Sequence, residues 1–237
     1  MGKIALITGV SRNMGLGFET AKQLSVLGYT VIITAREIAR VTPLAADAGL
    51  VSMQLDVTDD ASVTALAEKV ERQYGKLHVL INNAGGFFDQ GGMALATDMQ
   101  FAQDAFALNV QGAWRMVKAF KPLLEKSKEG CIVNVSSGAG SFSDPTFGLA
   151  NHPGHVPAYA ITKLALNGLT VKLARELKDS AIKINAVCPG FVATYPGTEA
   201  WGARPVADGA RGIVWAATLP ADGPTGEFFR DGKRLDW

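Results

Sequence analysis

Residues 4–17, with the sequence IALITGVSRNMGLG, decide the fold of this chain. An aliphatic run typical of a buried strand passes into a loop that contains Gly9, Gly15 and Gly17, and a helical pattern follows. A bound phosphate needs close backbone approach, a tight turn and the free N–H groups of a helix start. The place of this loop, between the first strand and the first helix, predicts a binding site for a dinucleotide pyrophosphate.

The same alternation of short apolar runs and longer helical patterns continues along the chain. Strands are predicted at 3–8, 30–35, 50–55, 77–82, 130–136, 182–188 and 226–229. Helices are predicted at 15–27, 59–74, 99–126, 157–178 and 207–218, with a weaker one at 37–48 that Pro43 interrupts. Strands that are apolar almost throughout suit a parallel sheet covered on both faces. We therefore expect an α/β protein: a single Rossmann-type domain over 1–237, with a doubly wound parallel sheet of about seven strands flanked by helices.

Charge and hydropathy exclude several classes of partner. The net charge is +1, so no broad electrostatic field favours nucleic acid or an anionic membrane. No apolar run is long enough to span a bilayer, and the first residues lack the pattern of a secretory leader. We expect a cytoplasmic protein that binds neither nucleic acid nor membrane.

Few residues suit metal or redox chemistry. Cys131 and Cys188 adjoin apolar strands, which predicts buried, reduced thiols. His152 and His155 lie close together in the sequence, but no cluster of Cys or His accompanies them, so no metal site is expected. His78 precedes an apolar strand and is expected to be structural.

The end of the second predicted strand bears on the choice between NAD and NADP. An acidic residue there would bind the ribose hydroxyls of NAD. This chain instead has Arg36, whose planar cation suits the 2′-phosphate of NADP, and Arg12 in the glycine loop could join it. Glu37 follows directly and could still serve a ribose, or both arginines could simply be solvated. The phosphate argument favours NADP(H) over NAD(H).

Tyr159 and Lys163 form the first part of a candidate catalytic site. Their spacing places them one turn apart on the same face of the predicted helix 157–178. A free phenol has a pKa of about 10, and a neighbouring ammonium is expected to lower it so that the hydroxyl exchanges protons near neutral pH. Because Tyr-x-x-x-Lys is a common string, this interpretation depends on further polar residues.

Such residues occur at other strand ends. The strand at 130–136 leads into Ser136-Ser137, where a hydroxyl can donate to a carbonyl oxygen. The small residues of Asn82-Asn83-Ala84-Gly85-Gly86 would let a cofactor lie against the backbone. Asn109 falls inside a predicted helix, where asparagine has a poor propensity, so it is either a local structural cap or a polar relay residue.

In order and approximate spacing, these motifs resemble the short-chain dehydrogenase/reductase family over nearly the whole chain. The resemblance rests on Thr8-Gly9, Asp56-Val57, Asn82-Asn83-Ala84-Gly85, Asn109, Ser136-Ser137, Tyr159-x-x-x-Lys163 and Pro189-Gly190-Phe191-Val192-Ala193-Thr194. The stretches 187–190 and 226–234 look most like the carbonyl reductase branch of that family.

The resemblance implies an NADP(H)-dependent oxidoreductase that moves a hydride between the cofactor and a carbonyl or alcohol carbon. Tyr159 would exchange the proton, and Ser137 would hydrogen-bond the reacting oxygen. Lys163 would tune Tyr159 and hold the nicotinamide ribose, and Asn109 would order a water leading to Lys163. The expected cofactor-binding residues are Gly9, Ser11, Arg12, Gly15, Leu16, Gly17, Arg36, Asp56, Val57, Asn83, Ala84, Gly85, Tyr159, Lys163, Pro189, Gly190, Val192 and Thr194.

The chain departs from the family pattern in two places. Its glycine loop is longer than the common form, as in enoyl reductase relatives, which suggests an enone reductase as an alternative. The spacing of Tyr159 and Lys163 opposes that alternative. The segment between Ser137 and Tyr159 is also longer than in many relatives and is expected to form a loop or short helix near the substrate.

A second alternative is a non-catalytic sensor that binds NAD(P) and signals through a partner. Such a protein has no need of Ser137, Tyr159 and Lys163 together, so their presence argues against it. We expect a small carbonyl or alcohol substrate of apolar or aromatic character, and a homodimer or homotetramer formed through helices. The candidate pocket residues are Phe87, Phe88, Phe142, Phe147, Tyr195 and Trp201.

Overall fold

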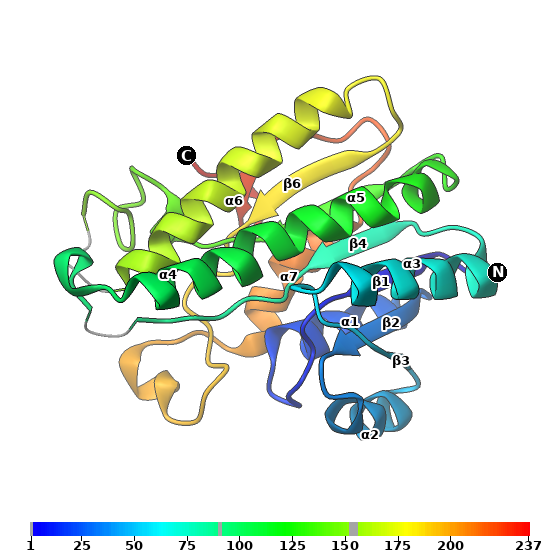
Figure 1. Ribbon diagram of the computed structural model, residues 1–237, viewed down its shortest axis with the longest axis horizontal. Helices are drawn as coiled ribbons and strands as arrows, with labels where there is room; N and C mark the ends of the chain where they lie inside the picture. The colour runs from blue at the N-terminus through cyan, green and yellow to red at the C-terminus, as the bar shows by residue number, and fades with distance from the viewer. Residues whose placement is uncertain (1, 90–91, 152–155) are drawn as a thin grey trace.

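The strand order places the first strand in the middle of the sheet. In the computed structural model, which describes residues 2–89, 92–151 and 156–237, the order is β3-β2-β1-β4-β5-β6-β7-β8 (Figure 1). The strands are β1 (Ile4–Ile7), β2 (Thr30–Ala35), β3 (Val51–Gln54), β4 (Val79–Asn82), β5 (Cys131–Val135), β6 (Lys183–Val187), β7 (Phe228–Arg230) and β8 (Lys233–Arg234). The order reverses between β1 and β4, and ligands of such sheets bind at the carboxyl ends of the strands near that point.

The predicted parallel sheet is confirmed for β1 to β7, and the structure adds one strand that is antiparallel. All strands pair in parallel except β7 and β8, which are antiparallel. Asp231 and Gly232 connect these two strands, and both have positive φ, as a two-residue hairpin turn requires. The extra strand escaped prediction because two charged residues give no hydrophobic alternation.

Helices cover both faces of the sheet. On one face lie α1 (Leu16–Val26), α2 (Ile38–Ala48) and α7 (Val206–Ala217). On the other lie α3 (Asp60–Tyr74), α5 (Gly112–Glu125) and α6 (Pro157–Glu176), with α4 (Met99–Phe106) leading into α5 (Figure 1). Among the described residues, no helix is both long enough and apolar enough to cross a membrane.

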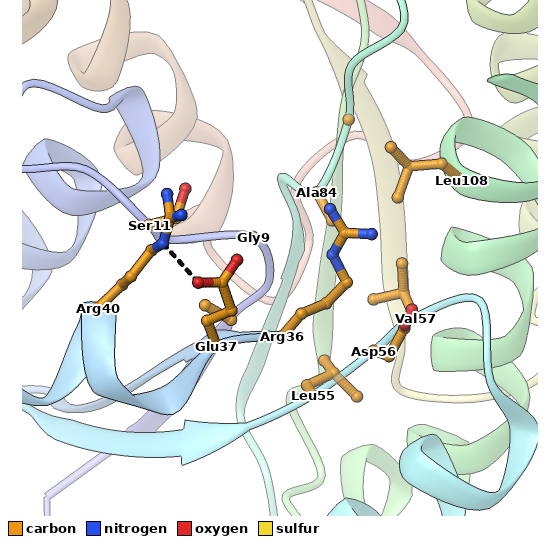
Figure 2. Close-up of a pocket in the computed structure, with 12 residues that line it drawn as sticks. Gly9, Ser11, Arg36, Glu37, Arg40, Leu55, Asp56, Val57, Ala84 and Leu108 are labelled. Carbon is orange, nitrogen blue, oxygen red and sulfur yellow. Dashed lines mark hydrogen bonds and ion pairs between the residues drawn. The ribbon is translucent and has the colours of Figure 1, made fainter. Parts of the chain in front are cut away.

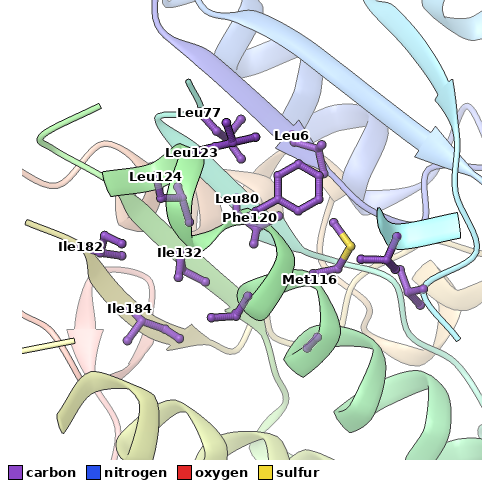
Figure 3. Packing of buried hydrophobic residues seen from close by; sticks show 14 of the residues in the cluster. Leu6, Leu77, Leu80, Met116, Phe120, Leu123, Leu124, Ile132, Ile182 and Ile184 are labelled. Carbon is purple, nitrogen blue, oxygen red and sulfur yellow. The ribbon is translucent and has the colours of Figure 1, made fainter. Parts of the chain in front are cut away.

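The larger core lies between the sheet and helices α3, α5 and α6. Phe120 and Met116 of α5 are fully buried near Leu6, Leu80 and Ile132 of three neighbouring strands (Figure 3). In β1, β2, β4 and β5, alternate residues face the other core, so these strands are apolar on both sides. Burying a phenylalanine side chain contributes about 1.5–3 kcal/mol, so these contacts hold the helices that carry the site.

Two helix predictions need correction. The predicted helix 99–126 is divided by a π-helical turn, Ala107–Gln111, which contains Asn109. Helix α2 runs through Pro43 without interruption.

His78, Cys131 and Cys188, which were predicted to be structural, are buried in the structure. The Nδ1 atom of His78 accepts a hydrogen bond from the Ile4 N–H at 3.0 Å. Cys131 and Cys188 are free and buried, and burial raises the pKa of Cys131 to about 12. His152 and His155 lie outside the described residues, and elsewhere in the described chain no three His, Cys, Asp or Glu side chains gather into a metal-binding group.

Candidate active site and nucleotide cleft

The glycine loop crosses the end of β4 at a distance that only glycine allows. Gly9 has a φ of 71°, and a Cβ atom there would lie 2.5 Å from the Cα atom of Ala84. The hydroxyl of Thr8 accepts hydrogen bonds from the N–H groups of Asn83, at 3.1 Å, and Ala84, at 2.9 Å. These contacts hold the glycine loop against the end of β4. Because Gly9 has no side chain, the backbone of the loop is accessible from the cleft.

The start of α1 is held by the same strand end. A Cβ atom at Gly17 would lie 2.6 Å from Nδ2 of Asn83, which donates to the Thr8 carbonyl at 2.8 Å. The residue before the helix is Gly15, so no side chain caps its first N–H groups. Uncapped N–H groups at a helix start attract a phosphate, which supports the predicted pyrophosphate site.

A cavity of about 200 Å³ opens beside this loop, at the carboxyl ends of β1 to β4. Its lining residues are Gly9, Ser11, Ala35, Arg36, Glu37, Arg40, Leu55, Asp56, Val57, Ala84, Gly85 and Leu108 (Figure 2). Seven of the predicted cofactor residues therefore come together here, from segments that are far apart in the sequence. Burial raises the pKa of Asp56, but hydrogen bonds from Thr58 and the charge of Arg36 hold it below its usual value.

The acidic residue that follows Arg36 is paired with a second arginine, which the sequence analysis did not anticipate. Arg36 extends from the end of β2 toward Ala84, whereas Glu37 faces Arg40 (Figure 2). The Nε atom of Arg40 lies 2.7 Å from a carboxylate oxygen of Glu37, so the acidic residue beside Arg36 is paired. Sequence reasoning missed Arg40, although it lies one helical turn after Arg36.

Arg12 lies elsewhere. It does not line the cavity with Arg36; its guanidinium carbon lies 4.1 Å from the ring centre of Tyr195. Its Nη1 atom also lies 3.4 Å from the Thr194 carbonyl oxygen. The long glycine loop thus reaches across to the segment that follows β6, which sequence spacing alone did not indicate.

Ser137, Tyr159 and Lys163 meet at the carboxyl end of β5. The Ser137 hydroxyl lies beside the Tyr159 hydroxyl, close enough to influence its pKa. The ammonium of Lys163 donates to the Val135 carbonyl at 2.8 Å and lies 5.4 Å from the ring centre of Tyr159. The predicted catalytic group is therefore assembled from one strand end and one helix face.

Burial governs the acidity of these groups. It lowers the pKa of Lys163 to about 8. It also raises the pKa of Tyr159 above that of a free phenol, and the hydrogen bond from Ser137 offsets this only in part. The expected lowering of the Tyr159 pKa by Lys163 is wrong for this structure, because desolvation of the phenolate outweighs the favourable contacts.

A close approach fixes Lys163 relative to Ser137. The short helical turn Gly138–Gly140 follows Ser137 and packs directly on α6. A Cβ atom at Gly140 would lie 2.5 Å from the carbonyl carbon of Lys163 and 2.6 Å from the nitrogen of Leu164. Only glycine lets these two backbones meet.

Asn109 joins the site through its side-chain amide. Its Oδ1 atom accepts from the Gly86 N–H, and its Nδ2 atom donates to the Gly86 carbonyl, both at 3.0 Å. Nδ2 also donates to the Thr162 hydroxyl at 2.9 Å. Both amide hydrogens are therefore used by protein partners, so the structure places Asn109 as a tie between the β4 loop and α6. Gly85 lies beside it, and a Cβ atom there would be 3.4 Å from the Lys163 ammonium.

A buried ion pair lies beneath the site. The guanidinium of Arg230 on β7 pairs with Asp144, whose side chain is only 1% exposed. Arg230 also donates to the sulfur of Cys188, at 3.1 Å and 3.3 Å. The same sulfur accepts the N–H groups of Gly138, at 3.1 Å, and Gly190, at 3.4 Å. This network joins the loop after β5 to the loop after β6, and sequence reasoning did not find it.

The remaining predicted cofactor residues follow β6. Gly190 has a φ of 79°, and a Cβ atom at Gly209 of α7 would lie 2.7 Å from the Val192 side chain. The N–H of Thr194 donates to the Val192 carbonyl at 2.8 Å. These contacts bring the segment from Pro189 to Thr194 to the same edge of the sheet as the catalytic group.

The candidate pocket aromatics are placed differently from one another. The ring of Phe88 lies 4.6 Å from the ring of Tyr159, whereas Phe87 packs edge-on against Phe101 of α4. Tyr195 packs under Arg12, and Phe142 and Trp201 are exposed. Phe88 thus directly contacts the catalytic group.

The fold and these side chains define a class of protein: a Rossmann-type nucleotide-binding oxidoreductase. The model of the short chain dehydrogenase family matches residues 3–202, and the chain belongs to that family. A (+)-neomenthol dehydrogenase of Arabidopsis thaliana is 32% identical over 290 residues, which cover 96% of this chain and 95% of the relative.

Two solved structures support the same assignment. Salutaridine reductase from Papaver somniferum superposes with a TM-score of 0.80 at 26% identity, over 96% of this chain and 99% of that chain. ElxO with NADP bound superposes with a TM-score of 0.83 at 28% identity, over 97% of each chain. The protein is therefore an enzyme that acts on CH–OH and C=O groups, as its family and its relatives' names indicate.

Proposed function

We propose that this enzyme is an NADP(H)-dependent reductase of the carbonyl reductase type, which interconverts a carbonyl compound and its alcohol. The observation that carries this proposal is the meeting of Ser137, Tyr159 and Lys163 at the carboxyl end of β5. When bound, NADPH supplies the hydride that the carbonyl carbon accepts.

The protein residues handle the proton and the oxygen. The raised pKa keeps Tyr159 protonated at neutral pH, so it can donate to the carbonyl oxygen as that oxygen gains charge. The Ser137 hydroxyl, which lies beside the phenol, holds the same oxygen in reach. The Lys163 ammonium, fixed by the Val135 carbonyl, stabilises the phenolate that remains. In the reverse direction Tyr159 takes the proton from an alcohol.

The residues of the cleft support a dinucleotide with a 2′-phosphate as the cofactor. Gly9 and the uncapped start of α1 would bind the pyrophosphate, and Asp56 and Val57 would flank the adenine. Arg36 would pair with the 2′-phosphate, and Arg40, which pairs with Glu37, adds a second cation to the same cavity. The NADP bound in the ElxO structure supports the same choice.

Several broader expectations also stay proposals. Phe88, beside Tyr159, supports an apolar or aromatic substrate. A groove between α5 and α6 supports a homodimer or homotetramer formed through these helices; it is lined by Trp114, Val117, Lys118, Lys121, Leu173, Glu176 and Leu177. All described strands belong to one sheet, which supports a single domain over 1–237. The free buried thiols agree with a cytoplasmic location.

The test combines nucleotide binding with turnover. Wild type should bind NADPH and oxidise it only when a ketone, aldehyde or quinone is present, giving the alcohol. Tyr159→Phe should lose turnover by at least about 10²-fold while binding NADPH as wild type does, because only the proton donor is removed. Tyr74→Phe, a change in a tyrosine at the end of α3, is the matched control and should be fully active.

Each other outcome has a meaning. Full activity of Tyr159→Phe would refute the proton-transfer role. Reduction of an enone at its carbon–carbon bond would establish the enone reductase instead. Binding of NADPH with no turnover of any of these compounds would favour the sensor.

A further inference from the structure

The loop after β4 reaches the first turn of the catalytic helix through one carboxylate. The Oδ2 atom of Asp89 accepts the N–H of Ala158 at 2.8 Å, and its Oδ1 atom lies 3.4 Å from the N–H of Tyr159. These two N–H groups belong to the second and third residues of α6, which begins at Pro157. Asp89 thus contacts the backbone of the residue that carries the catalytic phenol.

Helix α6 needs this contact because it has no cap of its own. The residue before it, Val156, is in the left-handed conformation, with a φ of 60°, and offers no side-chain acceptor. Pro157 has no N–H, so Ala158 and Tyr159 carry the first donors of the helix, the groups that a capping side chain normally satisfies. Asp89 supplies that acceptor from outside the helix, and its charge suits the positive end of the helix dipole.

The segment that presents Asp89 is itself held in place. Asn109 binds both the N–H and the carbonyl of Gly86, as described above. Phe87 has a φ of 63°, which residues other than glycine rarely adopt. The centre of its ring lies 5.3 Å from the centre of the Phe101 ring. Phe88 then lies on the Tyr159 ring, at 4.6 Å between ring centres. Contacts of the three residues before Asp89 therefore hold this part of the loop, up to its carboxylate, against α4 and α6.

We propose that Asp89 is a positioning residue for Tyr159. By holding the first turn of α6, it keeps the phenol hydroxyl at Ser137, while Phe88 covers the phenol ring from the loop side. Asp89 acts through the backbone of Tyr159 and does not touch the reacting atoms. This inference rests on the proposed function, because it concerns the proton that Tyr159 transfers.

The expected signature is a loss in turnover without a loss in cofactor binding. Without Asp89 the first turn of α6 loses its acceptor and the hydroxyl of Tyr159 moves. A displacement of about 1 Å at a reacting group can lower the rate by about 10²-fold. We therefore expect Asp89→Ala to lower kcat by about 10–100-fold and to leave the Kd for NADPH and the KM for the carbonyl compound nearly unchanged. The solvent deuterium isotope effect on kcat should rise, because proton transfer becomes slower.

Three further variants complete the design. Asp89→Asn keeps an oxygen acceptor of the same length, and asparagine caps helices as well as aspartate, so it should restore kcat to within about threefold of wild type. Asp89→Ser has a hydroxyl too short to reach α6, so it should repeat the loss even if Asp89→Ala fails to fold. Asp59→Ala is the matched control: Asp59 caps α3 through the N–H of Ala61, at 3.0 Å, and its loss should leave kcat unchanged.

The outcomes separate the inference from the proposed function. Wild-type kcat in Asp89→Ala or Asp89→Ser would overturn the positioning role, as would an Asp89→Asn variant as slow as Asp89→Ser. An equal fall of kcat in Asp59→Ala would also overturn it, since any lost cap would then have the same effect. Full activity of Tyr159→Phe would instead refute the proposed function, whatever the Asp89 variants show.

Discussion

Replacing Asp144 by alanine should destabilise this enzyme far more than removing a surface carboxylate. The Asp144 side chain is 1% exposed and pairs with Arg230, whose side chain is 22% exposed. Its Oδ1 atom also accepts the N–H groups of Thr146 and Phe147, both at 2.9 Å. In the variant, the Arg230 cation stays among buried atoms without a carboxylate.

The expected loss follows from this geometry. Removing one partner of a buried ion pair costs about 3–5 kcal/mol, because the other charge is left uncompensated. Arg230 keeps some contact with water and with Cys188, so we expect about 3 kcal/mol, the low end of that range. For a chain of this size, that loss lowers the melting temperature by about 6–12 °C.

The same ion pair should make wild type sensitive to acid. Burial raises the pKa of Asp144, but hydrogen bonds from Phe147 and Thr146 and the charge of Arg230 lower it further, so the net pKa is below its usual value. A carboxyl with a lowered folded-state pKa stabilises the protein above its unfolded pKa, about 3.9. That contribution disappears as the pH falls through the folded pKa. Below about pH 4 the stability of wild type should therefore approach that of Asp144→Ala.

Urea unfolding followed by circular dichroism, between about pH 3 and pH 8, measures both effects. Asp144→Asn, which keeps the shape and the acceptor Oδ1, should lose less than Asp144→Ala. Asp179→Ala is the surface control: Asp179 is 90% exposed and 4.0 Å from Lys178, so its loss should cost under about 1 kcal/mol. A loss in Asp144→Ala no larger than in this control, or one that is constant with pH, would refute the reasoning.

Three other predictions address the site. Arg36→Asp should weaken the binding of NADPH by at least about tenfold and that of NADH little, because a phosphate contact becomes a repulsion. Fluorescence titration with both nucleotides checks this, and an unchanged preference would exclude Arg36 from the phosphate site. Gly140→Ala should destabilise the protein by about 1–3 kcal/mol and lower kcat, because the added Cβ would clash with the backbone of Lys163. Thermal melts and turnover assays test this, with Gly168→Ala as the control, because a Cβ atom at Gly168 has open space. Carbonyl reduction should slow above about pH 8, where Lys163 loses its charge, and a pH–rate profile that stays flat to pH 10 would contradict that role.

The local parts of the site were open to prediction from the sequence. Gly9 and Gly17 mark a loop between a strand and a helix, and periodicity places Tyr159 and Lys163 on one helix face. The central strands β1, β2, β4 and β5 were found because each is buried on both sides and reads as a largely apolar run. The two-residue β8 was not, because it is short and charged.

The sign of the Tyr159 pKa shift was not predictable, because it depends on how much water the folded chain excludes. The sequence shows an ammonium one turn away, which alone would lower the pKa. The structure shows that the ammonium of Lys163 is directed to the Val135 carbonyl and that burial of the phenol raises the pKa. Desolvation is a property of the packed site and has no counterpart in the spacing of residues.

The sequence by itself determined the α/β sheet, the glycine loop and the Tyr159–Lys163 face, because hydrophobic period and glycine placement act over a few neighbouring residues. Only the tertiary structure decided that Arg12 lies on Tyr195, that Asn109 binds Gly86 within a π-helical turn, and that Asp89 caps α6. Each of these contacts joins segments that are distant along the chain, and their approach is set by how the helices pack on the sheet. No local pattern encodes such an approach, since it depends on the summed packing of the whole core.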